Sequence, residues 1–373
     1  MRLLRILHVI DSLGRGGAER QLVDQILAHD RSSIQCMVII FNPPLHLADE
    51  LRAAGVPIMT FDLPDFRDFA LAIVRLTALV KALRPDIVHT WLTRADIYGR
   101  IAAILSWRIP VISGIHAPIY APSMYLDNPQ QKRWKLALIR QIDRWSGYLS
   151  RTIYVGCSYD VARSTGQALS VPSERLRVIY NSINIPSATS SHSGKRIITI
   201  GRILPQKGQI YLVKAMPAIL AQHPDATLDI VGDGPLRAEL EQQVSILGIH
   251  QAIRFLGVRS DVPELLASSD VFAFPSLWEG LGIVMLEALA AGVPVVASNI
   301  AVLREIVDDG QQGLLVQPQN PQALAQGIIR LLADPDERRS MGRSGRQKMI
   351  ERFDINVAMN KWRDLYQELS PKE

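Results

Sequence analysis

Short apolar segments alternate with longer amphipathic segments along most of the chain. The apolar segments are rich in Val and Ile and have no polar face, which is typical of strands buried inside a parallel sheet. They lie at residues 5–13, 34–41, 85–91, 110–116, 152–158 and 176–182, and again at 196–202, 226–234, 253–257, 270–276 and 293–298. Segments of helical period separate them, for example 17–30 and 209–223. The pattern predicts an α/β protein with two doubly wound, Rossmann-like domains.

A small, polar segment without periodicity, residues 187–194, is typical of an exposed linker. We therefore expect a first domain over residues 1–186 and a second over 187–355. Residues 356–373 have the pattern of one more amphipathic helix. Ligands bind beyond the carboxyl ends of the strands in sheets of this kind, so two such domains facing each other would enclose a binding cleft.

Two glutamates frame a glycine-rich turn that follows the predicted strand 270–276. Glu279 falls in the loop and Glu287 in the next helix, so they could contact two ends of one extended ligand. The free N–H groups of a helix start, with Gly280 and Gly282 beside them, favour an anion between the two acids. Sugar, diphosphate and ribose in that order form a nucleotide sugar. The alternative is that both acids are solvated and merely favoured by the helix dipole.

Two cations follow the first strand of the second domain. Arg202 and Lys207 lie in "GRILPQKG", at a predicted strand end. A guanidinium fork and an ammonium would together neutralise a diphosphate. Surface solubility is the alternative explanation for each of them alone.

The composition is that of a globular protein, with 48% hydrophobic and 21% charged residues. No apolar run approaches the roughly 20 residues that cross a bilayer. Cys36 and Cys157 lie far apart in apolar segments, which favours buried, reduced thiols in a cytoplasmic protein. The net charge of +5 is uneven, with +7 over residues 1–186 and −2 over the rest.

Residues 131–151 carry much of that positive charge. Their basic residues are Lys132, Arg133, Lys135, Arg140, Arg144 and Arg151, against one acid, Asp143. Their apolar residues Trp134, Leu138, Ile142, Trp145 and Leu149 recur at helical spacing. The helix could dock on an anionic membrane surface, or it could pack on the first sheet with solvated cations outside. No nucleic-acid-binding motif accompanies the charge, so we expect no nucleic acid partner.

Several motifs taken together carry a family resemblance. They are "GRGGAERQL", "PDIVHTW", "SGIH", "VIYNSIN", "GRILPQKG", "VGDGPLR" and the E-x7-E stretch "EGLGIVMLE". With them the chain resembles, over nearly its full length, the retaining glycosyltransferases of GT-B fold, glycosyltransferase family 4 (group 1) type.

The resemblance implies a role for each matching residue. Glu279 would hold hydroxyls of the donor sugar, Glu287 the ribose, and Arg202 with Lys207 the diphosphate. His116 would lie beside the donor sugar, although a histidine that ends an apolar strand is often only a polar cap. The other implied donor contacts are Gly16 and Gly17 near the phosphates, Val258 and Arg259 near the nucleobase, and the backbone of Gly280, Leu281, Gly282 and Ile283. The final helix, 356–373, would cross back onto the first domain.

Two further histidines of the first domain lie in apolar strand segments. We expect His8 to lie in the core and His89 to line the cleft. Trp91 stands where many relatives have a second histidine. Its indole could stack on an acceptor sugar or simply pack.

The implied activity is transfer of a sugar, with retention, from a nucleoside-diphosphate sugar to a saccharide or lipid-linked acceptor in polysaccharide, glycolipid or cell-envelope biosynthesis. No Asp-x-Asp with neighbouring ligands suggests a magnesium site, so we expect neither metal nor cofactor beyond the donor. The enzyme would be cytoplasmic, with peripheral attachment to the inner face of the membrane as an option. The alternatives are a noncatalytic nucleotide-sugar-binding protein and a dinucleotide-dependent oxidoreductase. The second alternative would need a G-x-G-x-x-G motif after the first strand, and the sequence "GRGGAE" found there does not match it.

Overall fold

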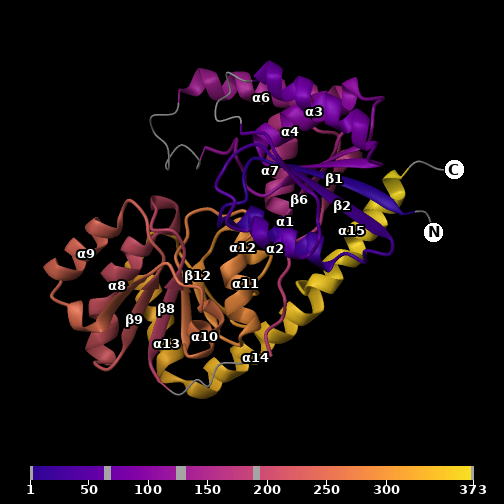
Figure 1. Ribbon diagram of the computed structural model, residues 1–373. Coiled ribbons are helices and arrows are strands. Elements are labelled where there is room, and N and C mark those ends of the chain that lie inside the picture. Colours follow the sequence, from indigo (N-terminus) through magenta and orange to yellow (C-terminus); the bar gives the residue numbers. More distant parts are fainter. Residues whose placement is uncertain (1–2, 63–68, 123–131, 188–193, 371–373) are drawn as a thin grey trace. The chain divides into compact units, whose positions relative to one another are not determined.

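The computed structural model describes residues 3–62, 69–122, 132–187 and 194–370 (Figure 1). The chain divides into two compact units. Unit 1 comprises Met1–Ala121, Gln130–Asn181 and Ile355–Glu373, and unit 2 comprises Pro122–Pro129 and Ser182–Asp354. Most of the predicted linker, residues 188–193, lies outside the described residues. No helix in the described ranges is long and apolar enough to cross a membrane.

Unit 1 contains a parallel seven-stranded sheet of order β3-β2-β1-β4-β5-β6-β7. Its strands are β1 (Leu4–Ile10), β2 (Ile34–Ile40), β3 (Ile58–Thr60), β4 (Ile87–Trp91), β5 (Val111–Ile115), β6 (Ile153–Gly156) and β7 (Leu176–Val178). Its helices include α1 (Gly17–Ala28), α2 (Ala48–Ala53), α3 (Phe69–Leu83), α4 (Thr93–Leu105), α6 (Arg133–Leu149), α7 (Tyr159–Leu169) and α15 (Ile355–Leu369).

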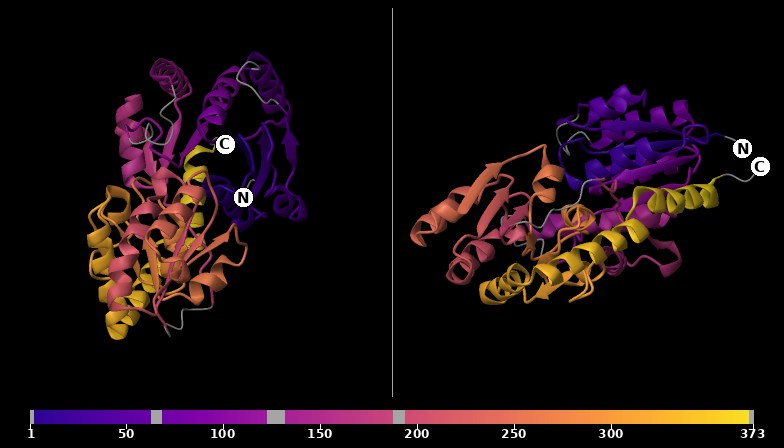
Figure 2. Two further views of the ribbon diagram at one scale, coloured as in Figure 1. Left: turned by 90° about the vertical axis from the view of Figure 1, so that its left-hand side faces the viewer. Right: turned by 90° about the horizontal axis from the view of Figure 1, so that it is seen from below.

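Helices cover both faces of this sheet, as Figures 1 and 2 show. Alternate residues of a strand point to opposite faces, so Ile6 of β1 joins the core under α1 and α15, whereas Leu7 joins the core under α3 and α4. Trp362 and Tyr366 of α15 belong to the first of these cores. The C-terminal helix is therefore a structural part of unit 1.

Unit 2 contains a parallel six-stranded sheet of order β10-β9-β8-β11-β12-β13. Its strands are β8 (Arg196–Ile200), β9 (Thr227–Val231), β10 (Ile253–Gly257), β11 (Val271–Phe274), β12 (Val295–Ser298) and β13 (Gly313–Val316). Its helical elements include η3 (Pro205–Lys207), α8 (Gln209–Gln222), α9 (Arg237–Ile246), α10 (Val262–Ala267), α11 (Ile283–Ala290), α12 (Ala301–Arg304), α13 (Pro321–Ala333) and α14 (Pro335–Arg352).

The predicted fold class is confirmed, because each unit is a doubly wound parallel sheet with helices on its faces. Sequence reasoning missed β3 and β13. Both are short and lie at the edge of their sheet, so they have too few residues to show a periodicity. The equally short β7 was predicted only as part of the longer segment 176–182.

The direction of winding reverses once in each sheet. In unit 1 the reversal falls between β1 and β4, and in unit 2 it falls between β8 and β11. Ligands of doubly wound sheets bind outside the carboxyl ends of the strands at such a switch point. The loops that leave β1, β8 and β11 therefore lie where a ligand of such sheets would bind.

Candidate active site

An ion pair occupies the switch point of unit 2. Lys207 lies at the end of η3, after β8, and Glu279 lies in the loop between β11 and α11. Lys207 Nζ is 2.5 Å from Glu279 Oε1, with 17% and 7% of the two side chains exposed. Because both groups are largely shielded from water, their attraction is stronger than that of a surface pair. The structure thus brings together two residues that the sequence analysis placed on the same ligand.

The two loops that carry this pair are hydrogen bonded to each other. Leu277 N donates to the Gln206 carbonyl at 2.7 Å, and Gln206 Nε2 donates to the Trp278 carbonyl at 3.0 Å. Gly208 has φ +62, and a Cβ added to it would lie 2.2 Å from the Pro275 carbonyl oxygen. Sequence reasoning missed Gln206, because a backbone-bridging amide has no signature of its own.

The start of α11 faces the same loop. Gly282 precedes the helix in a left-handed conformation, with φ +90, and Ile283 is the first helical residue. Glu287 lies one turn further on, roughly 6 Å along the axis, and is half-buried. The predicted order of strand, loop and helix is confirmed. Leu281 is 2% exposed, so a ligand beside it would meet its backbone rather than its side chain.

Arg202 shares the loop after β8 with Lys207, and its side chain is exposed. Its carbonyl accepts a hydrogen bond from Gln209 Nε2 at 3.1 Å, which fixes the backbone at the start of α8. The structure therefore places both predicted cations in one loop of unit 2. Only Lys207 of the two is held by the predicted acid Glu279.

Val258 and Arg259 follow β10, which β9 separates from β8. The Val258 side chain is exposed. Arg259 donates two hydrogen bonds to Asp261, of 2.7 and 2.6 Å. The guanidinium already has a carboxylate partner in its own loop, which limits its use as a cation for a ligand.

The loop after β1 ends in a helix start that already carries an anion. Gly16 caps α1, and Gly17 is its first residue. A Cβ added to Gly16 would lie 2.2 Å from Glu19 Oε2, so the Glu19 carboxylate folds back over the helix start. A glutamate three residues after a helix cap commonly does this. That spacing could have identified Glu19 from the sequence.

His116 follows β5 and stacks on Trp91 of β4. Their ring centroids are 4.7 Å apart and their planes differ by 7°. Trp91 is 1% exposed and donates from Nε1 to His8 Nδ1 at 3.2 Å. Of the two options for Trp91, the structure supports packing within unit 1.

His8 and His89 lie on the face of the sheet that α15 covers. His8 is fully buried, as predicted. His89 is fully buried too, and its ring lies 4.9 Å from that of Trp362. The prediction that His89 lines a cleft is wrong, because the C-terminal helix covers it. Burial lowers the pKa of His8 to about 3, that of His116 to about 4, and that of His89 well below its usual value.

A buried polar network supports the loop that leaves β5. Arg100 of α4 donates to Asp143 of α6 and to Ser113 of β5. Tyr120, four residues after His116, donates to Asp143 Oδ2 at 2.6 Å. Burial raises the pKa of the nearby Asp96 to about 7. Sequence reasoning missed this network, because its members come from four separate segments.

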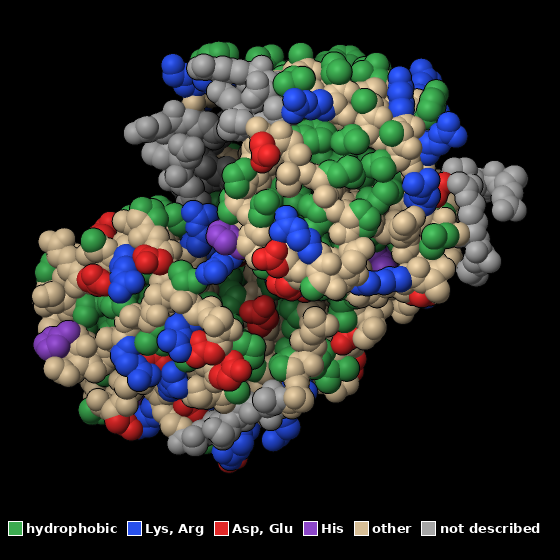
Figure 3. Space-filling view, viewed as in Figure 1, with side chains coloured by type: hydrophobic (Ala, Val, Ile, Leu, Met, Phe, Trp, Pro, Cys, Tyr) green, Lys and Arg blue, Asp and Glu red, His purple; other side chains and the backbone are tan. Residues whose placement is uncertain are grey.

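α6 presents its apolar stripe to the outside. Asp143, Ser146 and Gly147 are the buried residues of this helix. The exposed apolar side chains, between 38% and 63% exposed, are Trp134, Leu138, Ile142, Trp145, Tyr148 and Leu149. Hydrophobic side chains interleave with Lys and Arg along this edge of unit 1 (Figure 3). Among the described residues from 132 onward, the helix does pack in unit 1, against α4 and α7, with its cations exposed. It packs through the face with Asp143, however, and the apolar stripe stays outside.

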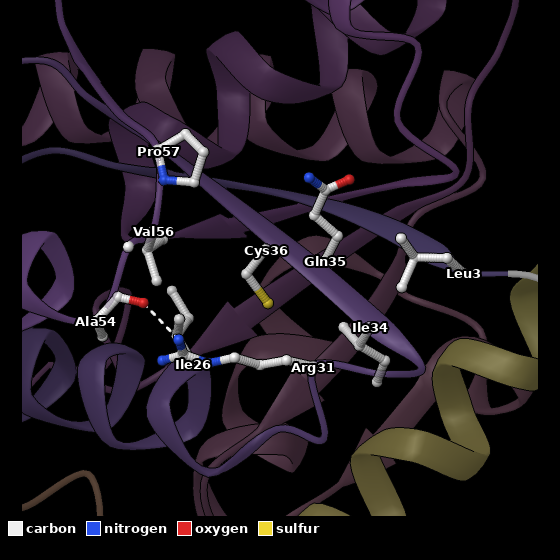
Figure 4. Close-up of a pocket in the computed structure, with 10 residues that line it drawn as sticks. Leu3, Ile26, Arg31, Ile34, Gln35, Cys36, Ala54, Val56 and Pro57 are labelled. Atoms are coloured by element: carbon white, nitrogen blue, oxygen red, sulfur yellow. Dashed lines mark hydrogen bonds between the residues drawn. The ribbon is translucent and has the colours of Figure 1, made fainter.

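A pocket at the other end of the strands contains no predicted site residue. It lies at the amino-terminal ends of β2 and β3, and Leu3, Arg31, Cys36 and Pro57 are among its lining residues (Figure 4). Cys36 and Cys157 are buried thiols, as predicted. Burial raises the pKa of Cys36 to about 12, so it is a poor nucleophile at neutral pH. In the described ranges, no group of three or more His, Cys, Asp or Glu could hold a metal ion.

The two doubly wound units, together with the matches that follow, define a GT-B glycosyltransferase that uses a nucleotide sugar. Residues 15–186 match the model of Glycosyltransferase Family 4, and residues 183–348 match that of Glycosyl transferases group 1. Together the two matches span residues 15–348, so the chain belongs to the glycosyltransferases of family 4 and group 1.

Individual relatives agree with this assignment. The chain is 27% identical, over 86% of its length and 85% of the relative's, to the UDP-Gal:alpha-D-GlcNAc-diphosphoundecaprenol alpha-1,3-galactosyltransferase of Escherichia coli. It is 37% identical, over 42% of its length and 44% of the relative's, to a GDP-mannose-dependent mannosyltransferase of phosphatidylinositol monomannoside from Mycolicibacterium smegmatis. The crystal structure of Anabaena Alr3699/HepE with UDP-glucose has a TM-score of 0.81 at 24% identity, and covers 98% of this chain and 100% of that one.

Proposed function

We propose that this glycosyltransferase moves a hexose from a nucleoside-diphosphate sugar to a saccharide or lipid-linked acceptor, with retention at the anomeric carbon and without a metal or other cofactor. The observation that carries the proposal is the Lys207–Glu279 pair at the switch point of unit 2. A cation and an acid held 2.5 Å apart suit the junction between a diphosphate and the sugar hydroxyls beside it.

The chemistry follows from where charge develops. The bond between the anomeric carbon and the diphosphate oxygen breaks while the acceptor oxygen bonds to the same carbon, and the acceptor proton passes to the departing diphosphate. Lys207, Arg202 and the start of α11 would stabilise the growing negative charge on the diphosphate. These groups accelerate the reaction to the extent that their contacts strengthen in the transition state. Glu279 would bind sugar hydroxyls while it holds the ammonium in place.

The other donor contacts follow the same layout. Glu287 would bind the ribose, and the backbone from Gly280 to Ile283 would approach sugar and phosphate. Val258 and Arg259 would lie near the nucleobase. In unit 1, Gly16 and Gly17 would approach the phosphates, and His116 would lie beside the donor sugar.

The test begins with the donor, because the names of the relatives include both UDP-Gal and GDP-mannose. Thermal unfolding with a panel of UDP, GDP and ADP sugars should show one nucleotide class that raises the Tm. With that donor, NMR of the product should show the donor's anomeric configuration, and EDTA should leave the rate unchanged. Inversion, or loss of activity in EDTA that a metal restores, would contradict the mechanism.

Site variants separate catalysis from binding alone. Lys207→Ala and Glu279→Ala should each abolish release of the nucleoside diphosphate while the protein stays folded. Exposed Lys214→Ala, on α8, provides a matched control that should retain activity. A protein that binds the donor but never releases the nucleoside diphosphate would be the noncatalytic alternative.

We further propose that α6 docks unit 1 on an anionic membrane that carries the acceptor. An outward apolar stripe with Arg133, Lys135, Arg140 and Arg144 beside it matches helices that lie in the headgroup region. The E. coli relative is named for a diphosphoundecaprenol acceptor, which supports a lipid-linked substrate.

Vesicle flotation tests this proposal. The protein should float with vesicles of anionic lipid at low salt, and much less with neutral lipid. The double change Trp134→Ser and Trp145→Ser should remove flotation, whereas Ile246→Ser, an equally exposed apolar residue on α9, should not. Equal flotation of both variants would overturn the assignment to α6.

A further inference from the structure

Four rings form a line on one face of the sheet in unit 1. His8 of β1 is the register partner of His89 in β4, and Trp91 lies two residues beyond His89 on the same face. Trp91 is the register partner of Gly114 in β5, and His116 lies two residues beyond Gly114. The ring of His89 lies 5.0 Å from that of His8 and 4.8 Å from that of Trp91. The line therefore connects the core with the histidine assigned to the donor sugar.

The C-terminal helix fixes the proton of one of these histidines. Gln25 Nε2 donates to the Tyr366 hydroxyl oxygen at 2.8 Å, and that hydroxyl lies 2.9 Å from His89 Nδ1. Burial holds the pKa of Tyr366 well above its usual value, so the phenol keeps its proton. Since the hydroxyl oxygen accepts from Gln25, its hydrogen is available to His89. When the hydroxyl donates to Nδ1, the one N–H of a neutral imidazole lies on Nε2 of His89.

Gly114 lets two ring nitrogens approach the same place. The position that a Gly114 Cβ would take is 3.4 Å from His89 Nε2 and 3.1 Å from His116 Nε2. Both nitrogens are buried, and neither has a hydrogen-bond partner of good geometry among residues 3–62, 69–122, 132–187 and 194–370. The Asn181 side chain lies close enough to the His116 ring to raise its pKa against the effect of burial. Nearly all buried polar groups in native proteins are hydrogen bonded. A water molecule or one hydroxyl beside Gly114 would serve both, accepting from His89 and donating to His116.

We propose that Tyr366 and His89 are positioning residues that fix the tautomer of His116. The direction of donation runs from Gln25 through Tyr366 and His89 to His116 Nε2, which leaves the His116 proton on Nδ1. Trp91 holds the plane of the His116 ring by stacking. His116 Nδ1 is buried and has no hydrogen-bond partner of good geometry among the described residues, so a substrate oxygen that reaches the ring would meet a fixed N–H donor there.

The structural part of this proposal needs no substrate. Protein with ¹⁵N-labelled histidine rings should show, by long-range ¹H–¹⁵N correlation, a protonated Nε2 in His89 and a protonated Nδ1 in His116. Tyr366→Phe should convert both rings to mixtures of tautomers, and Gln25→Met should do so to a smaller degree. Trp362→Phe, which alters packing against the same His89 ring, should leave both tautomers unchanged. A protonated Nε2 in wild-type His116, or unaltered spectra in Tyr366→Phe, would overturn the proposal.

The catalytic part rests on the proposed function. Tyr366→Phe should lower kcat about tenfold and leave the KM for the donor within about twofold, as for other changes to groups that orient a working histidine. Trp362→Phe, with a comparable change in Tm, should retain kcat. Equal loss in the two variants would overturn the positioning role. The ring tautomers can be measured by NMR even if the protein transfers no sugar. Failure of the proposed function is therefore distinguishable from failure of the proposed positioning role.

Discussion

Lys207 and Glu279 are 72 residues apart in the chain, and their side chains meet at 2.5 Å where β8 and β11 end. Local folding of either loop cannot bring the two side chains together, because they belong to separate strand–loop–helix segments. The sheet order places the two strands side by side, and the loops that leave them then meet. The central feature of the site is thus a consequence of sheet topology.

The pair should also contribute to stability. Lys207→Met leaves the Glu279 charge in a shielded site, so we expect the free energy of unfolding to fall by about 3 kcal/mol. The double variant Lys207→Met, Glu279→Gln should lose less than the two single variants together, because it leaves no unpaired charge. Urea unfolding of all four proteins measures the coupling. Additive losses would show that the pair is not coupled.

Gly208 and Gly248 offer a matched comparison of backbone conformation and packing. Both have left-handed φ values, +62 and +67, but only a Gly208 side chain would clash, with the Pro275 carbonyl. Gly248→Ala should cost about 1 kcal/mol in the free energy of unfolding, from backbone strain alone. Gly208→Ala should cost about 3 kcal/mol or more and weaken donor binding, because the Lys207 loop must move. Equal losses would refute the close contact.

His29 makes the fold sensitive to acid. Burial lowers its pKa from 6.5 to about 4, so the unfolded state binds its proton more readily than the folded state. The stability that this provides is present above pH 6.5 and is lost as the pH falls toward 4. Between pH 7.5 and 5, wild type should therefore lose about 2 kcal/mol more than His29→Phe. Urea unfolding at the two pH values tests this, and equal losses would contradict it.

Asp143 should control the ionisation of Asp96. Burial is the main reason why the pKa of Asp96 is raised to about 7, and the charge of Asp143 raises it further, whereas Arg100 lowers it. Asp143→Asn removes a negative charge and the partner of Arg100, so the pKa of Asp96 should fall. A ¹³C NMR titration of the Asp96 carboxyl group measures it. Asp160→Asn, at the exposed ion pair with Arg163, is the control and should leave the titration unchanged.

Local patterns determined what could be predicted about the fold. Alternation of apolar strands with amphipathic helices repeats over short windows, and each window reports which of its own residues are buried. Glu279 and Glu287 could be assigned to a loop and a helix for the same reason. The short edge strands β3 and β13 were missed, because three or four residues carry no period and, unlike β7, they were not part of a longer predicted segment.

Burial by distant segments was decided only in the tertiary structure. The sequence places His89 near the end of a strand. In the structure, the ring of Trp362 packs against it and the Tyr366 hydroxyl is hydrogen bonded to it, although both residues come more than 270 positions later. α6 has a helical apolar stripe that ordinarily predicts a buried face, yet the buried face is the one with Asp143, because Arg100 and Tyr120 supply its partners. Periodicity shows that a helix has two different faces. Which face is turned inward depends on the partners that other segments bring to it, and that information is not local to the helix.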